Sequence, residues 1–258
     1  YQHNGGVTIL NSTSGPALFN GTSGTLIIGN TVGNAGPGSA TWRGDWYSTV
    51  EIYRTNQLGT NVNVQFNPTA GNAYLVLRGS DTVIGNLSGT NNGGPAIIEN
   101  VEGDTGYGTG RLIVTQTTNA SFTGYVRDGN WNGNAGGLAL TKNGAATLTI
   151  NGIDSTGYVN YTGGTVVNEG RLILRNTATG GNFTNNNATV EFFADGYKMQ
   201  LSGGTLSGNG TYVKSRANDL WLGANGSTQN ISLASGGWID VQRGTLRNEY
   251  LAGNWSKP

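Results

Sequence analysis

Short apolar alternations, each bounded by glycine, asparagine or aspartate, are the feature of this chain that most restricts its fold. The clearest three lie within residues 138–177, at residues 147–150, 165–167 and 172–174. Alternation with a period of two places successive side chains on opposite faces, which predicts β-strands rather than helices. Strands this short cannot bury a core alone, but strands stacked coil upon coil cover one another. The pattern therefore predicts an all-β chain built as a solenoid.

Runs of the same kind continue on both sides of residues 138–177. They occupy residues 6–10, 16–19, 24–29, 49–54, 61–66, 73–78, 82–87, 95–99 and 110–115, and later residues 188–193, 199–206, 219–223, 231–233 and 237–241. Residues 61–66 alternate with asparagine facing outward, whereas residues 73–78 are more continuously apolar, as in a strand buried on both faces. No segment predicts a helix. Asparagine and threonine stacked along one corner are expected to form ladders of hydrogen bonds.

The composition fits an ordered, turn-rich chain with few charges. Of 258 residues, 45 are glycine and only 11% are charged, yet 9% are aromatic, which disfavours a disordered chain. A net charge of +0 predicts no nucleic-acid partner and no anionic membrane surface. The absence of cysteine excludes disulfides and cysteine metal sites. No apolar run approaches the roughly 20 residues of a spanning helix, so we expect no direct membrane insertion by this segment.

No change of composition marks a linker, so residues 1–258 are expected to form a single β-solenoid domain. At about 20 residues per coil, the domain would contain roughly a dozen coils. Residues 1–4 are not a signal peptide, and residues 255–258 carry no mark of an end. We therefore expect the chain to be a segment of a longer protein.

A three-part motif stands out within residues 138–177. Its parts are LTKNGAATLTI, YTGGT and NEGRLIL, in that order. Its defining positions are Leu140, Lys142, Gly144, Leu148, Tyr161, Gly163, Gly164, Thr165, Gly170, Leu172 and Leu174. The motif resembles the autotransporter-associated β-strand repeat, also called the passenger-associated transport repeat, although Ala146 stands where glycine is usual.

This resemblance implies a right-handed parallel β-helix in an exported bacterial protein, located outside the cell or at its surface. In autotransporters such repeats form a stalk that presents other modules. We therefore expect an extracellular structural β-solenoid that acts as a stalk, an adhesin or a component of a biofilm matrix. Predicted partners are surface glycans and the surfaces of host or neighbouring cells.

Two alternatives compete with this interpretation. The first is a self-assembling subunit of an extracellular filament, because strand edges exposed at the ends of a solenoid favour end-to-end or lateral association with further copies. The second is a polysaccharide-active β-helix enzyme, which would need paired carboxylates. Glu99, Glu102 and Asp104 form the densest acidic cluster, with Arg111 nearby in sequence.

The simpler interpretation of that acidic cluster is an exposed loop with surface charge, and the loop spacing of a known calcium site is absent. The single histidine, His3, lies near the start of the chain, and neither a G-x-S-x-G motif nor a P-loop occurs. We therefore expect no enzyme activity, no catalytic residue, no cofactor and no metal.

An aromatic stretch is the better candidate for contact with a partner. It consists of Trp42, Trp46, Tyr47 and Tyr53. These rings predict a sugar-stacking platform or a subunit interface, against the simpler possibility that a loop packs over the side of the coil. Within it, residues 43–45 spell Arg-Gly-Asp, a tripeptide that some host adhesion receptors bind. Asn-x-Thr triplets at Asn160 and Asn182 are possible glycosylation sites, although such triplets are expected in so polar a chain.

Overall fold

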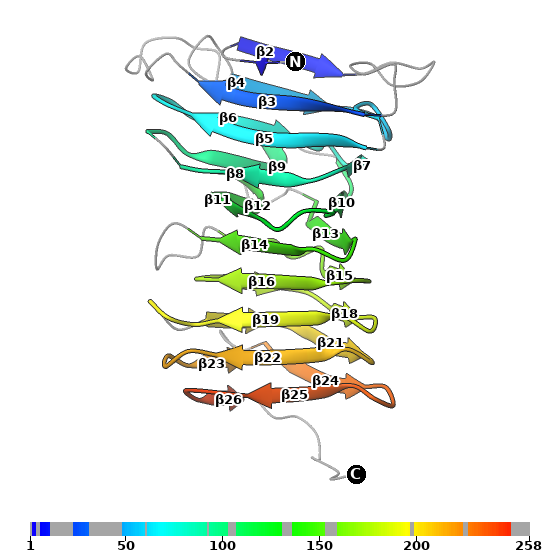
Figure 1. Ribbon diagram of the computed structural model, residues 1–258, viewed down its shortest axis with the longest axis vertical. Helices are drawn as coiled ribbons and strands as arrows, with labels where there is room; N and C mark the ends of the chain where they lie inside the picture. Colours follow the sequence, from blue (N-terminus) through cyan, green and yellow to red (C-terminus); the bar gives the residue numbers. More distant parts are fainter. Residues whose placement is uncertain are drawn as a thin grey trace.

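The computed structural model of the chain describes residues 2–3, 6–10, 23–30, 48–59, 61–91, 93–102, 107–130, 136–152, 159–196, 199–223 and 227–248. These residues form 26 strands and no helix. The strands pair in parallel throughout the described ladders and stack as one column (Figure 1). The predicted all-β parallel solenoid is thus confirmed. None of the described residues lies in a helix long and apolar enough to cross a membrane.

Sheet A, with ten strands, runs along the length of the column. Its order is β1 (Gln2–His3), β3 (Gly24–Asn30), β5 (Val62–Pro68), β8 (Leu87–Gly89), β11 (Ala120–Thr123), β14 (Thr147–Asn151), β16 (Arg171–Arg175), β19 (Thr189–Phe193), β22 (Thr211–Ser215) and β25 (Trp238–Val241). Sheet C is a second face, in the order β7 (Asp81–Ile84), β10 (Gly110–Thr115), β13 (Leu138–Asn143), β15 (Thr165–Val167), β18 (Phe183–Asn185), β21 (Gly204–Gly208) and β24 (Gln229–Leu233).

Two shorter sheets share the third face. Sheet B comprises β2 (Gly6–Leu10), β4 (Ser48–Ile52), β6 (Ala73–Val76), β9 (Ala96–Glu102) and β12 (Tyr125–Asn130). Sheet D comprises β17 (Ala178–Gly180), β20 (Met199–Ser202), β23 (Leu220–Leu222) and β26 (Leu246–Asn248). Between them, Val159 bridges to Val126 of β12, and the Tyr161 carbonyl accepts a hydrogen bond from Gly180 of β17. Each coil from β7 onward therefore visits sheet C, then sheet A, then the B or D face.

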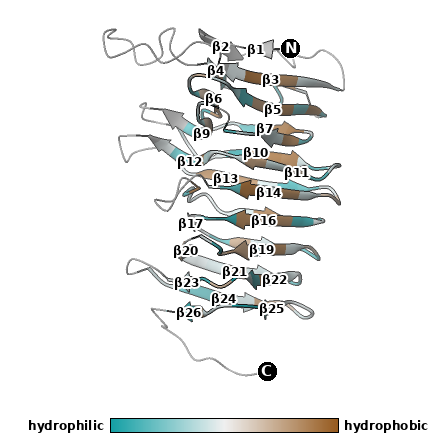
Figure 2. Ribbon diagram, turned by 60° about the vertical axis from the view of Figure 1, so that its left-hand side comes forward, coloured by the Kyte–Doolittle hydropathy of each residue, from teal (hydrophilic) through white to brown (hydrophobic). Residues whose placement is uncertain are grey.

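The core is made of columns of apolar side chains that continue from coil to coil. In sheet A, Leu148 pairs with Leu172, Leu172 with Val190, and Val190 with Tyr212, and all four side chains are buried. Hydrophobic residues recur on successive strands of this sheet, including β3, β14 and β16 (Figure 2). A fully buried aliphatic side chain contributes about 1.5–3 kcal/mol, so repeated columns stabilise strands that would not persist singly.

The coils are not uniformly about 20 residues long, as the sequence had suggested. Arg171 pairs with Thr189, 18 positions later, whereas Gly24 pairs with Val62, 38 positions later. The paired strands keep a continuous parallel register in both coils, whatever the length of chain between them. Sheet A holds ten strands, somewhat fewer than a dozen coils would give.

Most predicted strands are present, with some differences in detail. Residues 61–66 alternate between buried and more exposed side chains, and β6 is buried throughout, both as predicted. The predicted strand at residues 82–87 is divided into β7 and β8, because the chain turns at Gly85. A Cβ there would lie 2.7 Å from the side-chain oxygen of Asn63. Strands β1, β11, β12, β13, β17, β18 and β22 were not predicted, and the run at residues 16–19 lies outside the described residues.

Candidate functional site

The three-part motif lies where the third face passes from sheet B to sheet D. Its first part forms β13 and β14, and its last part forms β16. Leu140, Leu148, Leu172 and Leu174 all point into the core. The motif therefore supplies two strands of sheet C, β13 and β15, and two strands of sheet A, β14 and β16. On the third face between them, the described residues form the single bridge of Val159 to Val126.

Tyr161 lies on that third face. Its side chain is fully buried, and its hydroxyl is 2.6 Å from Oγ1 of Thr165. Burial raises the pKa of Tyr161 well above its usual range, although the hydrogen bond with Thr165 partly opposes this. The ring is part of the main hydrophobic core, two residues after the bridge that Val159 forms with β12.

The motif glycines lie where the turns of successive coils approach most closely. Gly144 has a φ of 81°, and a Cβ on it would lie 2.3 Å from the backbone oxygen of Gln116 in the preceding coil. Gly170 has a φ of 65°, and a Cβ on it would lie 2.6 Å from the oxygen of Ala145. Glycine is needed at these corners because no side chain fits between the stacked turns.

Lys142 connects two of these turns from inside. Its ammonium donates hydrogen bonds to the carbonyl oxygen of Gly144 in its own coil and, at 2.8 Å, to that of Glu169 in the next coil. Lys214 repeats the arrangement, with Nζ 2.9 Å from the Arg216 oxygen and 2.8 Å from the Arg243 oxygen. Both lysines are buried. The motif lysine is therefore an inter-coil brace.

The pKa of Lys142 predicts how stability depends on pH. Burial lowers this pKa from 10.5 to about 8, with Glu169 acting in the opposite direction. Between these values the unfolded chain binds a proton that the folded chain has released, so the free energy of unfolding should rise from pH 8 towards pH 10.5. Above pH 10 the buried tyrosines oppose this, because they keep protons that the unfolded chain loses.

Urea unfolding at pH 8 and pH 9.5 would test this expectation. Wild-type protein should be more stable at the higher pH, and Lys142→Met should reduce the increase. Part of the increase should remain in this variant because burial also lowers the pKa of Lys214. An equal increase in the variant would contradict the assignment to Lys142.

Asparagine ladders lie along the corner between sheets C and A, as predicted. The Asn168 amide donates to the Asn143 side chain at 2.8 Å, and the Asn186 amide donates to Asn168 at 2.9 Å. In earlier coils, Asn86 donates to the side-chain oxygen of Asn63 at 3.0 Å. Each bond joins neighbouring coils, so the ladder adds polar contacts at the same interval as the strand pairing.

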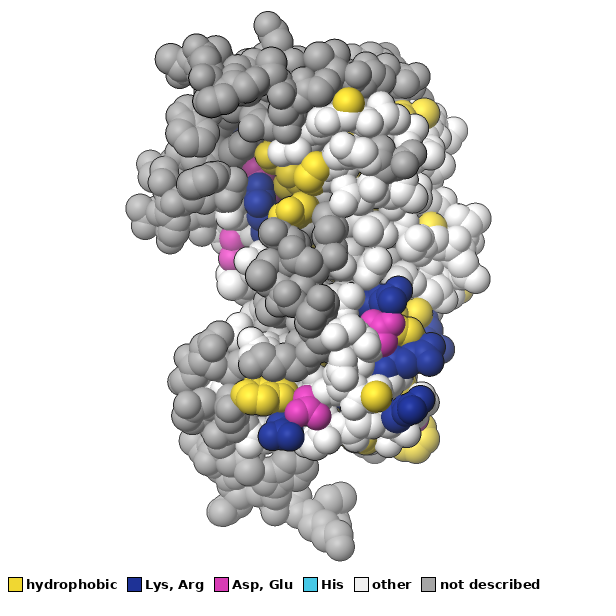
Figure 3. Space-filling view, turned by 90° about the vertical axis from the view of Figure 1, so that its left-hand side faces the viewer, with side chains coloured by type: hydrophobic (Ala, Val, Ile, Leu, Met, Phe, Trp, Pro, Cys, Tyr) yellow, Lys and Arg dark blue, Asp and Glu magenta, His cyan; other side chains and the backbone are white. Residues whose placement is uncertain are grey.

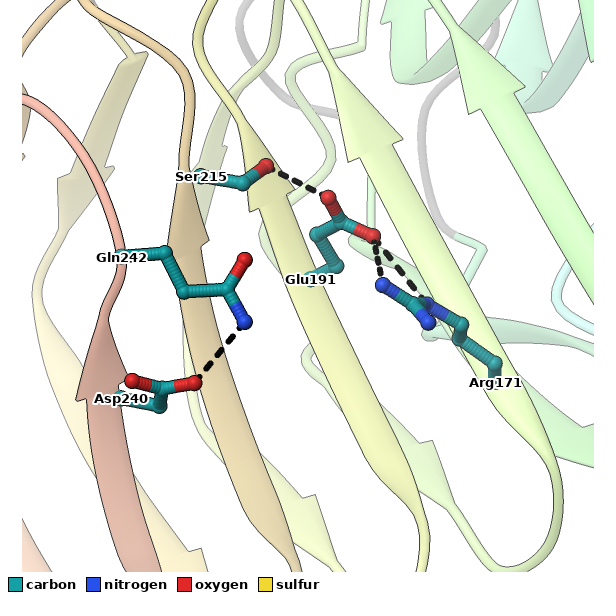
Figure 4. Close-up of polar contacts among 5 residues, drawn as sticks. All are labelled: Arg171, Glu191, Ser215, Asp240 and Gln242. Atoms are coloured by element: carbon teal, nitrogen blue, oxygen red, sulfur yellow. Dashed lines mark hydrogen bonds and ion pairs between the residues drawn. The ribbon is translucent and has the colours of Figure 1, made fainter.

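Arginine–carboxylate pairs also join neighbouring coils. The pairs are Arg78–Glu51 at 3.0 Å, Arg111–Asp81 at 3.4 Å, Arg127–Glu99 at 2.8 Å, Arg171–Glu191 at 2.5 Å, Arg175–Asp195 at 2.6 Å and Arg247–Asp219 at 2.7 Å. In Figure 4, Glu191 of β19 accepts hydrogen bonds from Arg171 of β16 and from Ser215 of β22, so it links three coils. Asp240 and Gln242 form a separate pair one coil further on.

The prediction that the acidic cluster is an exposed loop is wrong for Glu99. This residue lies in β9, is fully buried, and accepts a hydrogen bond from Arg127 at 2.8 Å. Arg111 pairs with Asp81 rather than with the predicted cluster. The side chain of Glu102 and all of Asp104 lie outside the described residues. Within the described ranges, no group of three or more potential metal ligands is found.

The aromatic stretch is described only at its last member. Trp42, Trp46, Tyr47 and the Arg-Gly-Asp tripeptide lie outside the described residues. Tyr53 packs edge-on against Tyr107, with ring centroids 6.2 Å apart, and the Arg78 guanidinium lies over its ring at 5.7 Å. Burial, followed by the neighbouring Glu51 carboxylate, raises the pKa of Tyr53 to about 12. Tyr53 is therefore part of a packed charged cluster on the flank.

Sequence reasoning missed three residues that the structure singles out. Asp128 of β12 accepts hydrogen bonds from the backbone N–H groups of Leu138 at 2.6 Å and of Thr162 at 2.9 Å. It therefore holds the start of β13 beside the segment that precedes β15. Lys214 lies outside the three-part motif, so no sequence pattern indicated that it is buried. The sequence placed Trp238 in a strand but did not indicate its contact. Its side chain is 61% exposed, and its indole nitrogen donates a hydrogen bond to the Thr211 hydroxyl in the preceding coil.

Comparisons with known proteins agree with the motif. Residues 140–174 match the family model of the passenger-associated-transport-repeat. No curated protein and no solved structure matches the chain. This repeat suggests an exported bacterial surface protein, and its combination with a parallel solenoid fits a structural domain of the autotransporter-passenger type. The chain is therefore a parallel β-solenoid that carries a passenger-associated-transport-repeat at residues 140–174.

Proposed function

We propose that this domain is a stalk in an extracellular bacterial surface protein, and that it supplies length and rigidity rather than catalysis. The observation that carries the proposal is the use of its polar side chains. Among the described residues, six arginine–carboxylate pairs, two buried lysines and the asparagine ladders all connect neighbouring coils. Such nearest-neighbour braces stiffen a column along its axis.

A polysaccharide-active enzyme is less well supported. Its general acid would need a carboxyl group whose pKa is raised, with a second carboxyl group facing it across the sugar. Glu99 and Glu51 instead each form an inter-coil ion pair, Glu99 with Arg127 at 2.8 Å and Glu51 with Arg78 at 3.0 Å. We propose that these carboxylates are structural.

Self-assembly is a second candidate, favoured by the end of the column that holds β24, β25 and β26. Among the strands that the structure describes, each of these is the last in its sheet. Their core-facing residues Ile231, Leu233, Ile239 and Leu246 are only partly buried, whereas Leu206 and Tyr212 one coil earlier are buried. Unpaired strand edges beside apolar side chains favour addition of another coil from a second copy of the chain.

One experiment tests the stalk and its competitor together. The register of β16 and β19 makes residues 171–188 one complete coil, because Thr189 occupies the position of Arg171 one coil later. We expect a chain with three extra tandem copies of residues 171–188 to fold. Its maximum dimension in small-angle X-ray scattering should increase by about 14 Å, at about 4.8 Å per coil. The wild-type chain should leave a broad panel of polysaccharides undegraded.

The scattering mass measured over a concentration series separates the two candidates. A constant monomer mass with the expected lengthening supports a stalk, whereas a mass that grows with concentration, with filaments in electron micrographs, supports assembly. Failure of the extended chain to fold while the wild-type chain folds would contradict a modular column. Release of oligosaccharides by wild-type protein, lost on Glu99→Gln, would contradict a purely structural role.

A further inference from the structure

Two arginines near the end of the described chain differ from the paired arginines. Arg216 and Arg243 are exposed, and neither has a carboxylate partner among the described residues, whereas Arg247 in the last described coil and Arg171 and Arg175 two coils before Arg216 do. Among the described residues, six inter-coil ion pairs hold arginines beside carboxylates. Arg216 and Arg243 are in none of them, and Asp240 of β25, three positions before Arg243, accepts a hydrogen bond from Gln242.

Arg216 and Arg243 lie in the turns that follow β22 and β25, which are neighbours in sheet A. Lys214 fixes both turns from inside, since its ammonium donates to the Arg216 oxygen at 2.9 Å and to the Arg243 oxygen at 2.8 Å. Arg216 also has a φ of 72°, which defines a tight turn. The two arginine backbones are thus held side by side by a third cation.

The Arg216 guanidinium has a fixed direction as well. It lies over the ring of Phe193 at 4.3 Å, and Arg175 lies over the same ring at 5.3 Å while bound to Asp195. Stacking on an aromatic ring leaves the N–H donors at the edge of the guanidinium free to bond. We call Arg175, Phe193, Asp195, Arg216 and Arg243 the arginine corner. In Figure 3 the viewer looks at the side of the column where the sheet A strands end. Basic side chains surround an acidic side chain there, in the lower half of the column.

We propose that the arginine corner binds an acidic polysaccharide through carboxylate or sulfate groups. Guanidinium groups form paired, charge-assisted hydrogen bonds with such planar or multi-oxygen anions. Neighbouring coils are spaced about 4.8 Å apart, and Arg216 and Arg243 are exposed residues in the turns of two successive coils, so they lie at successive steps along the axis. A polymer with anionic groups at regular intervals, lying parallel to the column, matches that arrangement.

Nucleic acid fits the arginine corner less well. Proteins that bind duplex DNA neutralise several phosphates, commonly 6–10 in strong binders, and carry a basic face. This corner offers two exposed arginines without a carboxylate partner, and the chain has no net charge. A less densely charged polymer needs fewer cations to be held. The inference goes beyond the stalk proposal and does not depend on it.

The test measures binding of the wild-type chain at low ionic strength to polygalacturonate, heparin, neutral dextran and duplex DNA. We expect binding to polygalacturonate or heparin, whichever carries the preferred anion, and none to dextran. The double variant Arg216→Gln/Arg243→Gln should bind the acidic polysaccharide with an affinity at least about tenfold lower than wild type. Each single variant, Arg216→Gln or Arg243→Gln, should also bind more weakly than wild type, and Arg111→Gln is their matched control, because it too removes one positive charge, from an exposed site that is paired with Asp81. Its affinity should stay within about twofold of wild type.

Circular dichroism melts of each variant establish that losses of binding do not arise from unfolding. Arg216→Lys adds a finer test, since it keeps the charge but lacks the planar donor set, and it should bind with intermediate affinity. Equal weakening by Arg111→Gln would overturn the inference, because it would indicate a general charge effect. Absence of binding to both acidic polysaccharides, or tighter binding to DNA, would overturn it too. None of these results bears on column length, so the stalk proposal is tested separately.

Discussion

Replacement of Arg78 by methionine is expected to destabilise the protein by about 3–5 kcal/mol, because it would leave the buried Glu51 carboxylate without its guanidinium partner. The side chains of both residues are at most 1% exposed, and their charged groups lie 3.0 Å apart. The Arg78 guanidinium is further held between the rings of Tyr53 and Tyr107, at 5.7 Å and 5.4 Å. Chemical denaturation of wild type and variant would measure the loss.

Arg111→Met is the matched control for this prediction. It breaks an ion pair of the same type, but Arg111 and Asp81 are 47% and 42% exposed, so the expected loss is at most about 1 kcal/mol. The double variant Arg78→Met/Glu51→Gln removes the stranded charge and should recover part of the stability. Equal losses from Arg78→Met and Arg111→Met would show that burial of the pair has no energetic consequence.

Replacement of Gly144 by alanine should destabilise the motif coil by several kcal/mol. The backbone there has a φ of 81°, which costs an alanine about 1–2 kcal/mol. The added Cβ would also lie 2.3 Å from the oxygen of Gln116 and 2.8 Å from its carbonyl carbon, both backbone atoms of the preceding coil. Relief requires the coils to separate locally, and overpacking of this kind typically costs a further 1–3 kcal/mol or so.

Gly108→Ala is the corresponding control, because a Cβ at that position meets no heavy atom within 4 Å. We expect its midpoint of thermal unfolding to match wild type, and that of Gly144→Ala to fall clearly. Hydrogen exchange should locate the effect in β13 and β14 and the coils next to them. A Gly144→Ala variant as stable as Gly108→Ala would mean that the turns are not closely stacked.

The sequence predicted the fold well because period-two alternation and turn residues are local signals. Residues 61–66 and 73–78 have the predicted burial, since the pattern reports directly which face is covered. The asparagine ladder was also predictable, because stacking repeats one residue type at one corner. The resemblance of residues 138–177 to a known repeat added the parallel arrangement, which short strands alone do not specify.

The missed features depend on contacts between residues distant in sequence. Lys142 was recognised as a motif position, but lysine is rarely buried, and only its carbonyl partners in two coils explain its place. The sequence alone predicts that Glu99 is a surface charge, because its ion-pair partner Arg127 lies 28 positions later in the chain. Strand β22 was not predicted, although four of its five residues are buried.

Every brace described here, whether a lysine, an asparagine ladder or an ion pair, connects a coil to its immediate neighbours. Each coil therefore finds most of its partners on the coil already in place, and closing it requires no distant part of the chain. A chain of this design can be wound progressively, one coil after another, while the remainder is still unfolded. Each coil already wound then serves as the template on which the next is added.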